Sequence, residues 1–167
     1  MAKLDFCLLN KKCIISMVVN NMKIAIGSDH GGYDLKEQLK YYLVKNGNDV
    51  TDVGTYSKAS CHYPEYAIKC AKQVSEGVCQ FGIIICTTGE GVVMVANKIK
   101  GIRAGLAYNT DVARLMREHN DANIMTLGAK FCTFKEAVER VNAFLDAKFQ
   151  EGRHAVRVQM IKNLDDK

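Results

Sequence analysis

The sequence predicts an α/β protein with an open, Rossmann-like, three-layer fold. The expected core is a five-stranded parallel sheet with helices on both faces and a C-terminal helix. Two observations predict it. From Met22 onward, short apolar segments typical of strands alternate with longer segments whose apolar residues recur at helical spacing. Segments such as Ile83-Ile84-Ile85 are apolar on both sides, as in parallel strands covered on both faces.

The first half of the chain contains three strand and helix pairs. Strands are expected at 23–28, 49–53 and 81–85. The first helix carries Leu35, Leu39 and Leu43 and ends at Asn46-Gly47. The second follows Pro64, and its apolar stripe consists of Tyr66, Ala67, Cys70, Ala71 and Val74. The third is expected at 91–98, directly behind the central strand.

The second half continues the alternation. Strands are expected at 102–108 and 124–127, with a helix at 110–118 between them. Thr133 and Glu136 form a capping box that opens the next helix. We expect four of its side chains to face inward: Phe134, Val138, Val141 and Leu145. A last helix is expected at 156–164.

Length and composition favour one domain. Residues 22–167 are expected to form it, and residues 1–21 to be an N-terminal extension of unknown role. The apolar stretch 13–19 is too short to span a membrane and has no small-residue cleavage site. The net charge is +5 but no basic run occurs, which argues against a nucleic-acid partner. Seven cysteines without a C-x-x-C spacing favour a reducing compartment, the cytoplasm.

The most informative segment is the strand that ends at Cys86 and continues as Thr87-Thr88-Gly89-Glu90-Gly91 into a helix. This order places a thiol against the backbone N–H groups of a helix N-terminus, which favour a thiolate and attract anions. A buried structural cysteine is the common alternative for a lone thiol. The Gly/Thr loop favours a reactive thiol beside an anion-binding loop.

Three further polar clusters are candidate binding elements. Asp29-His30-Gly31-Gly32 follows the first strand, where glycines let a ligand approach the backbone. The segment His119 to Asn123 offers a histidine for acid–base chemistry and Asn120 for hydroxyl binding, although Asn also caps helices. Arg153 and Arg157 are four residues apart, a spacing that lets two guanidinium groups hold one phosphate.

Taken together, these motifs resemble ribose-5-phosphate isomerase type B, a family related to the galactose-6-phosphate isomerase subunits. The resemblance covers the chain from Met22 to about its end. The motifs that carry it occur in the family's order: Gly27-Ser28-Asp29-His30-Gly31-Gly32, Asp52-Val53-Gly54-Thr55-Tyr56-Ser57, Tyr63-Pro64-Glu65-Tyr66-Ala67, the Cys86 loop, Ala96-Asn97-Lys98, Gly101-Ile102-Arg103-Ala104, His119-Asn120-Asp121-Ala122-Asn123 and Gly152-Arg153-His154.

The resemblance implies an aldose–ketose isomerase that uses no metal and no other cofactor. It implies Cys86 as the base that moves a proton between carbons 2 and 1, and His119 as the group that opens the furanose ring. Thr88 and the amides of Thr87, Gly89, Glu90 and Gly91 would stabilise the enediolate. Sugar hydroxyls and phosphate would be held by Asp29, Asn120, Tyr63, His30, Arg153, Arg157 and Lys130.

The resemblance also implies a homodimer, or a tetramer built from such dimers, with the site between two subunits. The His119-Asn120 segment and Lys130 would come from the partner chain. Four polar side chains, Cys61, His62, Cys86 and His119, have the residue types of metal ligands but no recognised ligand spacing.

The sequence departs from the family pattern at two positions in the catalytic loop, Thr87 and Glu90, and at Lys130 after the fifth strand. Thr87 stands where a glycine is usual and would be strained if that position needs a positive φ. Glu90 would oppose an enediolate if it pointed inward, so we expect it to point outward at the start of the helix. Lys130 replaces an arginine, which exchanges a bidentate phosphate contact for a point charge.

These departures leave two alternatives to ribose 5-phosphate isomerisation open. One is the same chemistry on a hexose 6-phosphate of the allose or galactose type. The other is a phosphosugar-binding protein of weak catalytic activity.

Overall fold

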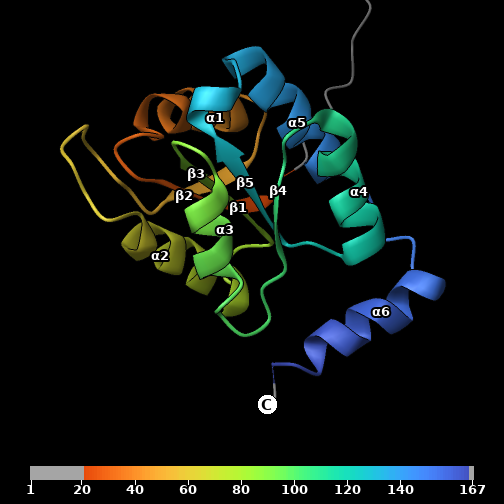
Figure 1. Cartoon of the computed structure of the whole chain (residues 1–167). Coiled ribbons are helices and arrows are strands. Elements are labelled where there is room, and N and C mark those ends of the chain that lie inside the picture. The colour runs from red at the N-terminus through yellow and green to blue at the C-terminus, as the bar shows by residue number, and fades with distance from the viewer. Residues whose placement is uncertain (1–20, 166–167) are drawn as a thin grey trace, which may run out of the picture.

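The computed structural model describes residues 21–165 and is built on a parallel sheet of five strands in the order β2-β1-β3-β5-β4 (Figure 1). The strands are β1 (Lys23–Ser28), β2 (Asp49–Asp52), β3 (Phe81–Cys86), β4 (Ala104–Leu106) and β5 (Ile124–Gly128). All four pairings between neighbouring strands are parallel. The predicted α/β, Rossmann-like fold is confirmed.

Two helical layers cover the sheet, as Figure 1 shows. On one face lie α1 (Tyr33–Lys45), α4 (Thr110–Asn120) and α5 (Phe134–Asp146), and on the other lie α2 (Tyr63–Ser75) and α3 (Glu90–Ala96). A short 3-10 turn, η1 (Ala129–Phe131), follows β5. Alternate residues of β1 enter opposite cores: Ile24 and Ile26 pack under α1 and α5, whereas Ala25 packs under α2. The strands are therefore buried on both sides, which explains their continuous apolar sequence.

The last helix, α6 (Arg153–Lys162), lies outside these layers and packs against α4 (Figure 1). The backbone N–H of Gln150 donates to the carbonyl of Glu118 at 3.0 Å and ties the approach to α6 to α4. His154 and Val158 form its buried side. The other side exposes an apolar stripe of Val156, Met160 and Leu164, each more than 60% exposed.

The topology creates a crevice between β1 and β3. The chain leaves β1 toward the face that carries α1 and leaves β3 toward the face that carries α3. Because these connections diverge from adjacent strands, the space beyond the carboxyl ends of β1 and β3 is the switch point where ligands bind in such sheets. Asp29 and Cys86 lie at these two strand ends.

Several predicted boundaries were wrong, with physical reasons. The helix α4 extends to Asn120, so His119 belongs to its last turn and not to a loop; Asp121 caps it in the left-handed conformation. The helix α6 begins at Arg153, three residues before the predicted start. The edge strand β4 pairs only with β5, over three residues, and is shorter than predicted.

One predicted core residue was also wrong. Phe134 is 41% exposed at the start of α5, where its ring meets Tyr42 edge-on. Val141 and Leu145 are buried as predicted, and Val138 packs partly buried against the same core. The helix buries Phe144 instead, because its inward stripe starts one turn later, at Ala137.

Two further predictions concern the chain ends and membranes. The predicted extension at 1–21 lies outside the described residues apart from Asn21. Within residues 21–165, no helix has the length and apolar character needed to cross a membrane.

Candidate active site

The candidate residues form two clusters at opposite edges of the sheet. The first, here called the thiol cluster, lies at the carboxyl ends of the strands and contains Asp29, His30, Tyr63, Cys86, Thr87, Thr88, Gly89, Glu90, Gly91 and Lys130. The second, here called the histidine cluster, lies at the far end of α4 and on α6, and contains His119, Asn120, Arg153 and Arg157.

Cys86 ends β3 and turns its thiol into the start of α3. The backbone N–H of Gly89 donates to Cys86 Sγ at 3.0 Å, and the side chain is 5% exposed. Gly89 caps α3 with φ of +84°, and a Cβ there would lie 2.5 Å from Leu106 and 3.0 Å from the backbone of Leu127. Only glycine fits both the conformation and the space, so the loop fixes an N–H donor on the sulfur. A donor in this position stabilises a thiolate.

The two departures in this loop are accommodated. Among the described residues, Thr87 is not one of the non-glycine positions with positive φ, so the strain considered for a threonine here does not arise. Thr87 Oγ1 lies over Gly31, where a Cβ would come within 2.3 Å of it. Glu90 is exposed in the first turn of α3, as expected, and its N–H donates to Thr88 Oγ1 at 3.3 Å.

The chain after β1 places a carboxylate and an imidazole beside the thiol loop. Asp29 is 7% exposed; its Oδ1 accepts the Gly32 N–H at 3.0 Å, and its own N–H donates to the Ile85 carbonyl at 3.3 Å. These bonds hold Asp29 next to the residue that precedes Cys86. His30 is exposed, and its Nδ1 accepts the Cys61 N–H at 3.3 Å, which leaves Nε2 toward solvent.

Tyr63 closes the other side of the thiol cluster. It opens α2, and its ring packs on the backbone of Gly91, where a Cβ would lie 2.7 Å from Tyr63 Cζ. The ring is 39% exposed. Tyr63 therefore links α2 to the first turn of α3, directly after the thiol loop.

Lys130 lies beside the thiol of its own chain. Its backbone N–H donates to the Thr87 carbonyl at 3.1 Å, and its side chain is exposed. The resemblance assigned Lys130 to the partner's contribution together with His119 and Asn120. Within the described chain, the backbone of Lys130 lies next to Thr87, at the opposite edge of the sheet from these two residues.

The histidine cluster is organised around a pair of stacked rings. The rings of His119 and His154 lie parallel, with centroids 4.2 Å apart and an angle of 5° between the planes. His154 is 7% exposed. Burial, together with the neighbouring His119 and the positive charges of Arg153 and Arg157, lowers the pKa of His154. A neutral His154 can stack on His119 without charge repulsion.

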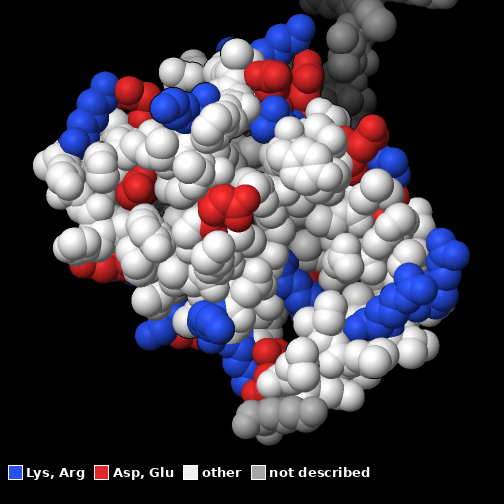
Figure 2. Space-filling view, in the orientation of Figure 1, with Lys and Arg blue, Asp and Glu red and all other residues white. Residues whose placement is uncertain are grey.

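The cationic side chains of this cluster face outward. Arg153 and Arg157 are exposed on successive turns of α6, and Figure 2 shows Lys and Arg side chains gathered along the outer side of this helix. Asn120 is exposed too, at the last residue of α4. The cluster therefore presents cations, an amide and an imidazole to whatever lies against this surface.

One chain does not bring Cys86 and His119 together. The turn after α4 hydrogen-bonds to β3 at Gly82, whose N–H donates to the Asn123 carbonyl at 3.0 Å. Gly82 precedes Cys86 by four residues of extended strand, a distance of roughly 13 Å. Groups that act on adjacent carbons of one substrate must lie within hydrogen-bond reach of them. The two clusters of a single chain therefore cannot act together on one substrate.

Sequence reasoning missed two features of the histidine cluster. His154 was part of a recognised motif but received no role, because stacking between helices leaves no signal in one sequence. Arg103 and Arg117 both contact Asp121, the residue after Asn120, and neither arginine was singled out. The one available signal was the isolated arginine in Gly101-Ile102-Arg103-Ala104, directly before an apolar strand.

Burial raises the pKa of Cys70 and also that of Cys132, so both thiols are held in the neutral form. Across residues 21–165, no group of three or more His, Cys, Asp or Glu side chains has the arrangement of a metal site.

Comparison with known proteins identifies the relatives of this chain. The ribose/galactose isomerase family model matches residues 24–161. Ribose-5-phosphate isomerase B of Escherichia coli is 39% identical over 145 residues, which cover 87% of this chain and 97% of the relative. Ribose-5-phosphate isomerase B of Clostridium thermocellum superposes with a TM-score of 0.86 at 47% identity, covering 87% of this chain and 98% of that structure. The enzyme from Mycoplasma genitalium with bound ribulose 5-phosphate gives a TM-score of 0.84 at 37% identity, covering 87% and 97%.

Proposed function

The chain belongs to the ribose/galactose isomerase family, and we propose that it interconverts ribose 5-phosphate and ribulose 5-phosphate. The observation that carries the proposal is the Cys86 thiol at the switch point of the sheet, with an N–H donor 3.0 Å from its sulfur. Similarity to ribose-5-phosphate isomerases B over 87% of the chain supports the choice of substrate. The free thiols fit a reducing compartment, and we place the enzyme in the cytoplasm.

Isomerisation moves one proton between two carbons, and the thiol cluster supplies the groups for this step. The Cys86 thiolate removes the proton from carbon 2 of the open-chain aldose, which leaves an enediolate. A proton passes from O2 to O1, and the Cys86 thiol returns its proton to carbon 1 to give the ketose. Negative charge develops on the enediolate oxygens, where Thr88 and the loop N–H groups from Thr87 to Gly91 act as fixed donors. Asp29 holds a sugar hydroxyl, and Tyr63 bounds the site beside Gly91.

The substrate phosphate needs cations away from the reacting carbons. His30 and Lys130 provide donors at the thiol cluster, and Arg153 and Arg157 provide them at the histidine cluster. Holding the phosphate at a distance from the chemistry fixes carbons 1 and 2 over the thiolate and lowers the entropic cost of the reaction.

The second half of the site comes from a second copy of the chain. His119 opens the furanose ring by transferring a proton at the ring oxygen, which is bonded to carbon 1, so it must lie a few ångströms from the carbons on which Cys86 acts. Its position on its own chain, at the opposite sheet edge, excludes this within one chain. A twofold dimer that joins the histidine cluster of one copy to the thiol cluster of the other forms two equal sites.

The surface of α6 supports such a dimer. Val156, Met160 and Leu164 form an exposed apolar stripe next to the stripe that carries Arg153 and Arg157. A stripe of this kind on a peripheral helix is typical of an interface between subunits. Burying it against a second copy would carry the arginines to the partner's thiol cluster.

Coexpression of two inactive variants tests this function. Cys86→Ser removes the base and His119→Ala removes the ring-opening group, so each variant alone should convert ribose 5-phosphate poorly. Coexpressed at equal levels, random pairing makes half of the dimers hybrids with one intact site each, so about a quarter of the wild-type activity per chain should return. Cys132→Ser serves as the matched control, because this thiol lies near the loop but outside the site. Without any recovery, the shared site is wrong.

The hexose phosphate alternative has its own test. The family model includes galactose isomerases, so the substrate set of this chain is decided by kinetics. Purified enzyme should show a higher kcat/KM with ribose 5-phosphate than with allose 6-phosphate or galactose 6-phosphate. Equal or better turnover of a hexose phosphate would replace the pentose as the proposed substrate.

A further inference from the structure

Two arginines hold the turn that follows α4. Arg103 Nη2 donates to Asp121 Oδ2 at 2.7 Å, and Arg117 Nη1 donates to Asp121 Oδ1 at 2.7 Å. Arg103 Nε donates to the carbonyls of Asp121 and Asn120 at 2.9 and 3.2 Å. Arg117 Nη1 also donates to the Ala122 carbonyl at 2.8 Å. We call this arrangement the Asp121 clamp: Arg103, Arg117 and Asp121.

The clamp is protected from solvent, which distinguishes it from an ordinary surface ion pair. The side chains of Arg103 and Arg117 are 13% and 12% exposed, and that of Asp121 is 25% exposed. Exposed ion pairs contribute little to rigidity, whereas partly buried arginines that bind a carboxylate and neighbouring backbone carbonyls at the same time fix geometry. The ring of Phe81 beneath the Arg117 guanidinium, 5.0 Å from its centroid, supports it further.

The clamp also fixes an unfavourable backbone conformation. Asp121 has φ of +48°, in the left-handed region, and ends α4 at the residue after Asn120. The strand side of the turn is fixed as well, since the Arg103 N–H donates to Asn123 Oδ1 at 2.9 Å and the Asn123 N–H to the Arg103 carbonyl at 3.1 Å. The direction in which α4 ends, and with it the direction of the Asn120 side chain, is therefore set from the segment before β4.

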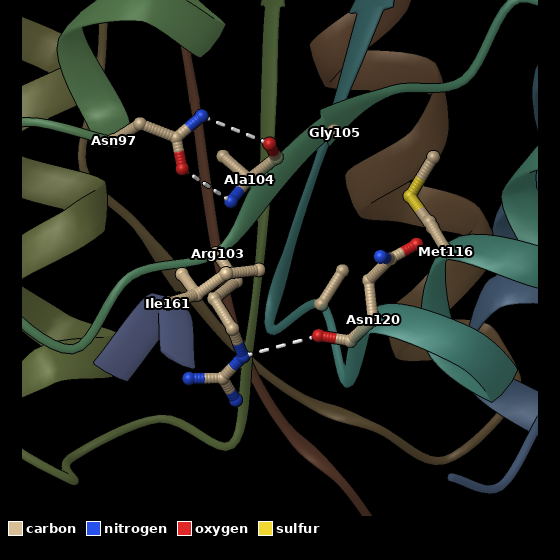
Figure 3. A pocket seen from close by; sticks show the side chains of 8 residues that line it. Asn97, Arg103, Ala104, Gly105, Met116, Asn120 and Ile161 are labelled. Atoms are coloured by element: carbon tan, nitrogen blue, oxygen red, sulfur yellow. Dashed lines mark hydrogen bonds between the residues drawn. The ribbon is translucent and has the colours of Figure 1, made fainter. Parts of the chain in front are cut away.

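Figure 3 shows this relation from close by. Arg103 reaches across to the backbone of Asn120, and both residues line a cavity of about 220 Å³ together with Met116 and Ile161 of α6. Among the residues that the structure describes, the side chain of Arg103 forms its hydrogen bonds with the end of α4 and none with the thiol cluster of its own chain. Any influence of Arg103 on catalysis would pass through Asn120 and His119.

We propose that Arg103 is a positioning residue for catalysis in the second subunit: through the Asp121 clamp it aims His119 and Asn120 at the partner's Cys86. The proposal rests on the proposed function, because it takes the shared site as given. It adds a residue that touches no substrate and whose effect belongs to the site of the neighbouring chain.

The first arm of the test measures the two directions of the reaction with Arg103→Met, which keeps an unbranched apolar stem and removes the guanidinium donors. Ribose 5-phosphate is mostly a furanose, whereas ribulose 5-phosphate cannot form a five-membered ring because its C5 oxygen carries the phosphate. A misaimed His119 should lower kcat with ribose 5-phosphate by roughly tenfold or more and change the initial rate with ribulose 5-phosphate much less. Arg103→Lys, which keeps the charge but not the forked contacts, should fall between.

Arg114→Met is the matched control. Arg114 also lies on α4 and pairs with Asp111 and Glu118, but it is 45% exposed and does not contact the turn. This variant should keep the wild-type ratio of the two rates. Equal losses in both directions with Arg103→Met would overturn the proposal, because general loosening of the fold gives that result.

The second arm uses hybrids and assigns the effect to one chain. In Cys86→Ser coexpressed with His119→Ala, the working site takes His119 from the first chain and Cys86 from the second. Placing Arg103→Met on the Cys86→Ser chain should remove most of the recovered activity, whereas placing it on the His119→Ala chain should leave the recovery unchanged. Equal effects from both placements would refute positioning. If the parent pair recovers no activity, the shared site itself is wrong, which is a result distinct from failure of the clamp.

Discussion

Gly32→Ala is the substitution whose effect follows most directly from the geometry of the site. Gly32 precedes α1 with φ of −100°, so its conformation is open to alanine and only space is at issue. A Cβ on Gly32 would lie 2.7 Å from the carbonyl oxygen and 2.8 Å from the carbonyl carbon of Ile85. These are backbone atoms of β3, one residue before Cys86, and cannot rotate away.

The magnitude follows from the required displacement. Ordinary contact begins at 3.4 Å, so the start of α1 and the end of β3 must separate by about 0.7 Å. Overpacking of this kind lowers the free energy of unfolding by about 1–3 kcal/mol, which lowers Tm by roughly 2–4 °C per kcal/mol in a domain of this size. The same shift moves Asp29 relative to the thiol, and a misplacement near 1 Å reduces kcat/KM by about 100-fold.

The assay combines urea denaturation with the rate of ribulose 5-phosphate formation. Gly105→Ala is the control, because its nearest atoms, at 3.2 Å, are the flexible end of Met116. It should cost less than about 1 kcal/mol and keep most of the activity. A Gly32→Ala enzyme that is as stable and as active as this control would refute the close packing of α1 on β3.

Four other predictions concern stability, pH and the thiol loop. Asp52→Asn should lower the free energy of unfolding by about 3 kcal/mol in urea titrations, because it removes a charged partner of the fully buried Lys36. The control Asp34→Asn, which breaks the exposed pair with Lys58, should cost under about 1 kcal/mol. Equal costs for the two variants would contradict the account. Burial acts to raise the pKa of Asp52, but hydrogen bonds from Lys36 and Lys40 outweigh burial and lower the pKa below 3.8. The stability that ionised Asp52 contributes is therefore present above pH 3.8 and is lost as pH falls through the folded-state pKa. In acid titrations, Asp52→Asn should show a smaller loss of stability than the wild-type chain. The pKa of His154 is lowered from 6.5, so stability should also fall as pH drops below 6.5, where the unfolded chain binds the proton first. Thermal unfolding of His154→Phe, which keeps a stacked ring, should show a smaller fall in stability over this pH range. An unchanged pH dependence in this variant would count against the role of His154. Gly89→Ala should reduce kcat about 100-fold by displacing the N–H donor to Cys86. The control Gly101→Ala also lies at positive φ, but its Cβ would have no atom within 4 Å, so this variant should lose stability and keep its kcat.

The sequence predicted the layers and the strand ends well, because those depend on local patterns. The apolar run before Cys86 and the leucine spacing of α1 predicted β3 and α1 closely. The prediction that Phe134 faces the core was wrong, because this residue is the first of its helix and precedes the buried stripe. The end of α4 was predicted two residues too early, because the helix continues to Asn120 and ends at the left-handed Asp121, which Arg103 and Arg117 hold.

The residues of the candidate site could be predicted from motifs, whereas their contacts could not. The resemblance expected His119 and Asn120 to come from a partner chain, and one chain places His119 at the opposite edge of the sheet from Cys86. The position of Lys130 beside Thr87 depends on how η1 follows β5, which the sequence does not encode locally. The His119–His154 stack and the Asp121 clamp depend on contacts between distant segments and could be found only in the structure.

The most direct test of the central claim is the rate at which the purified chain forms ribulose 5-phosphate from ribose 5-phosphate, measured beside Cys86→Ser and Cys132→Ser. The account predicts clear activity for the wild-type chain and for Cys132→Ser, and loss of turnover in Cys86→Ser with substrate binding largely retained. Full turnover by Cys86→Ser would contradict the assignment of the base, and the absence of turnover in the wild-type chain would contradict the proposed reaction.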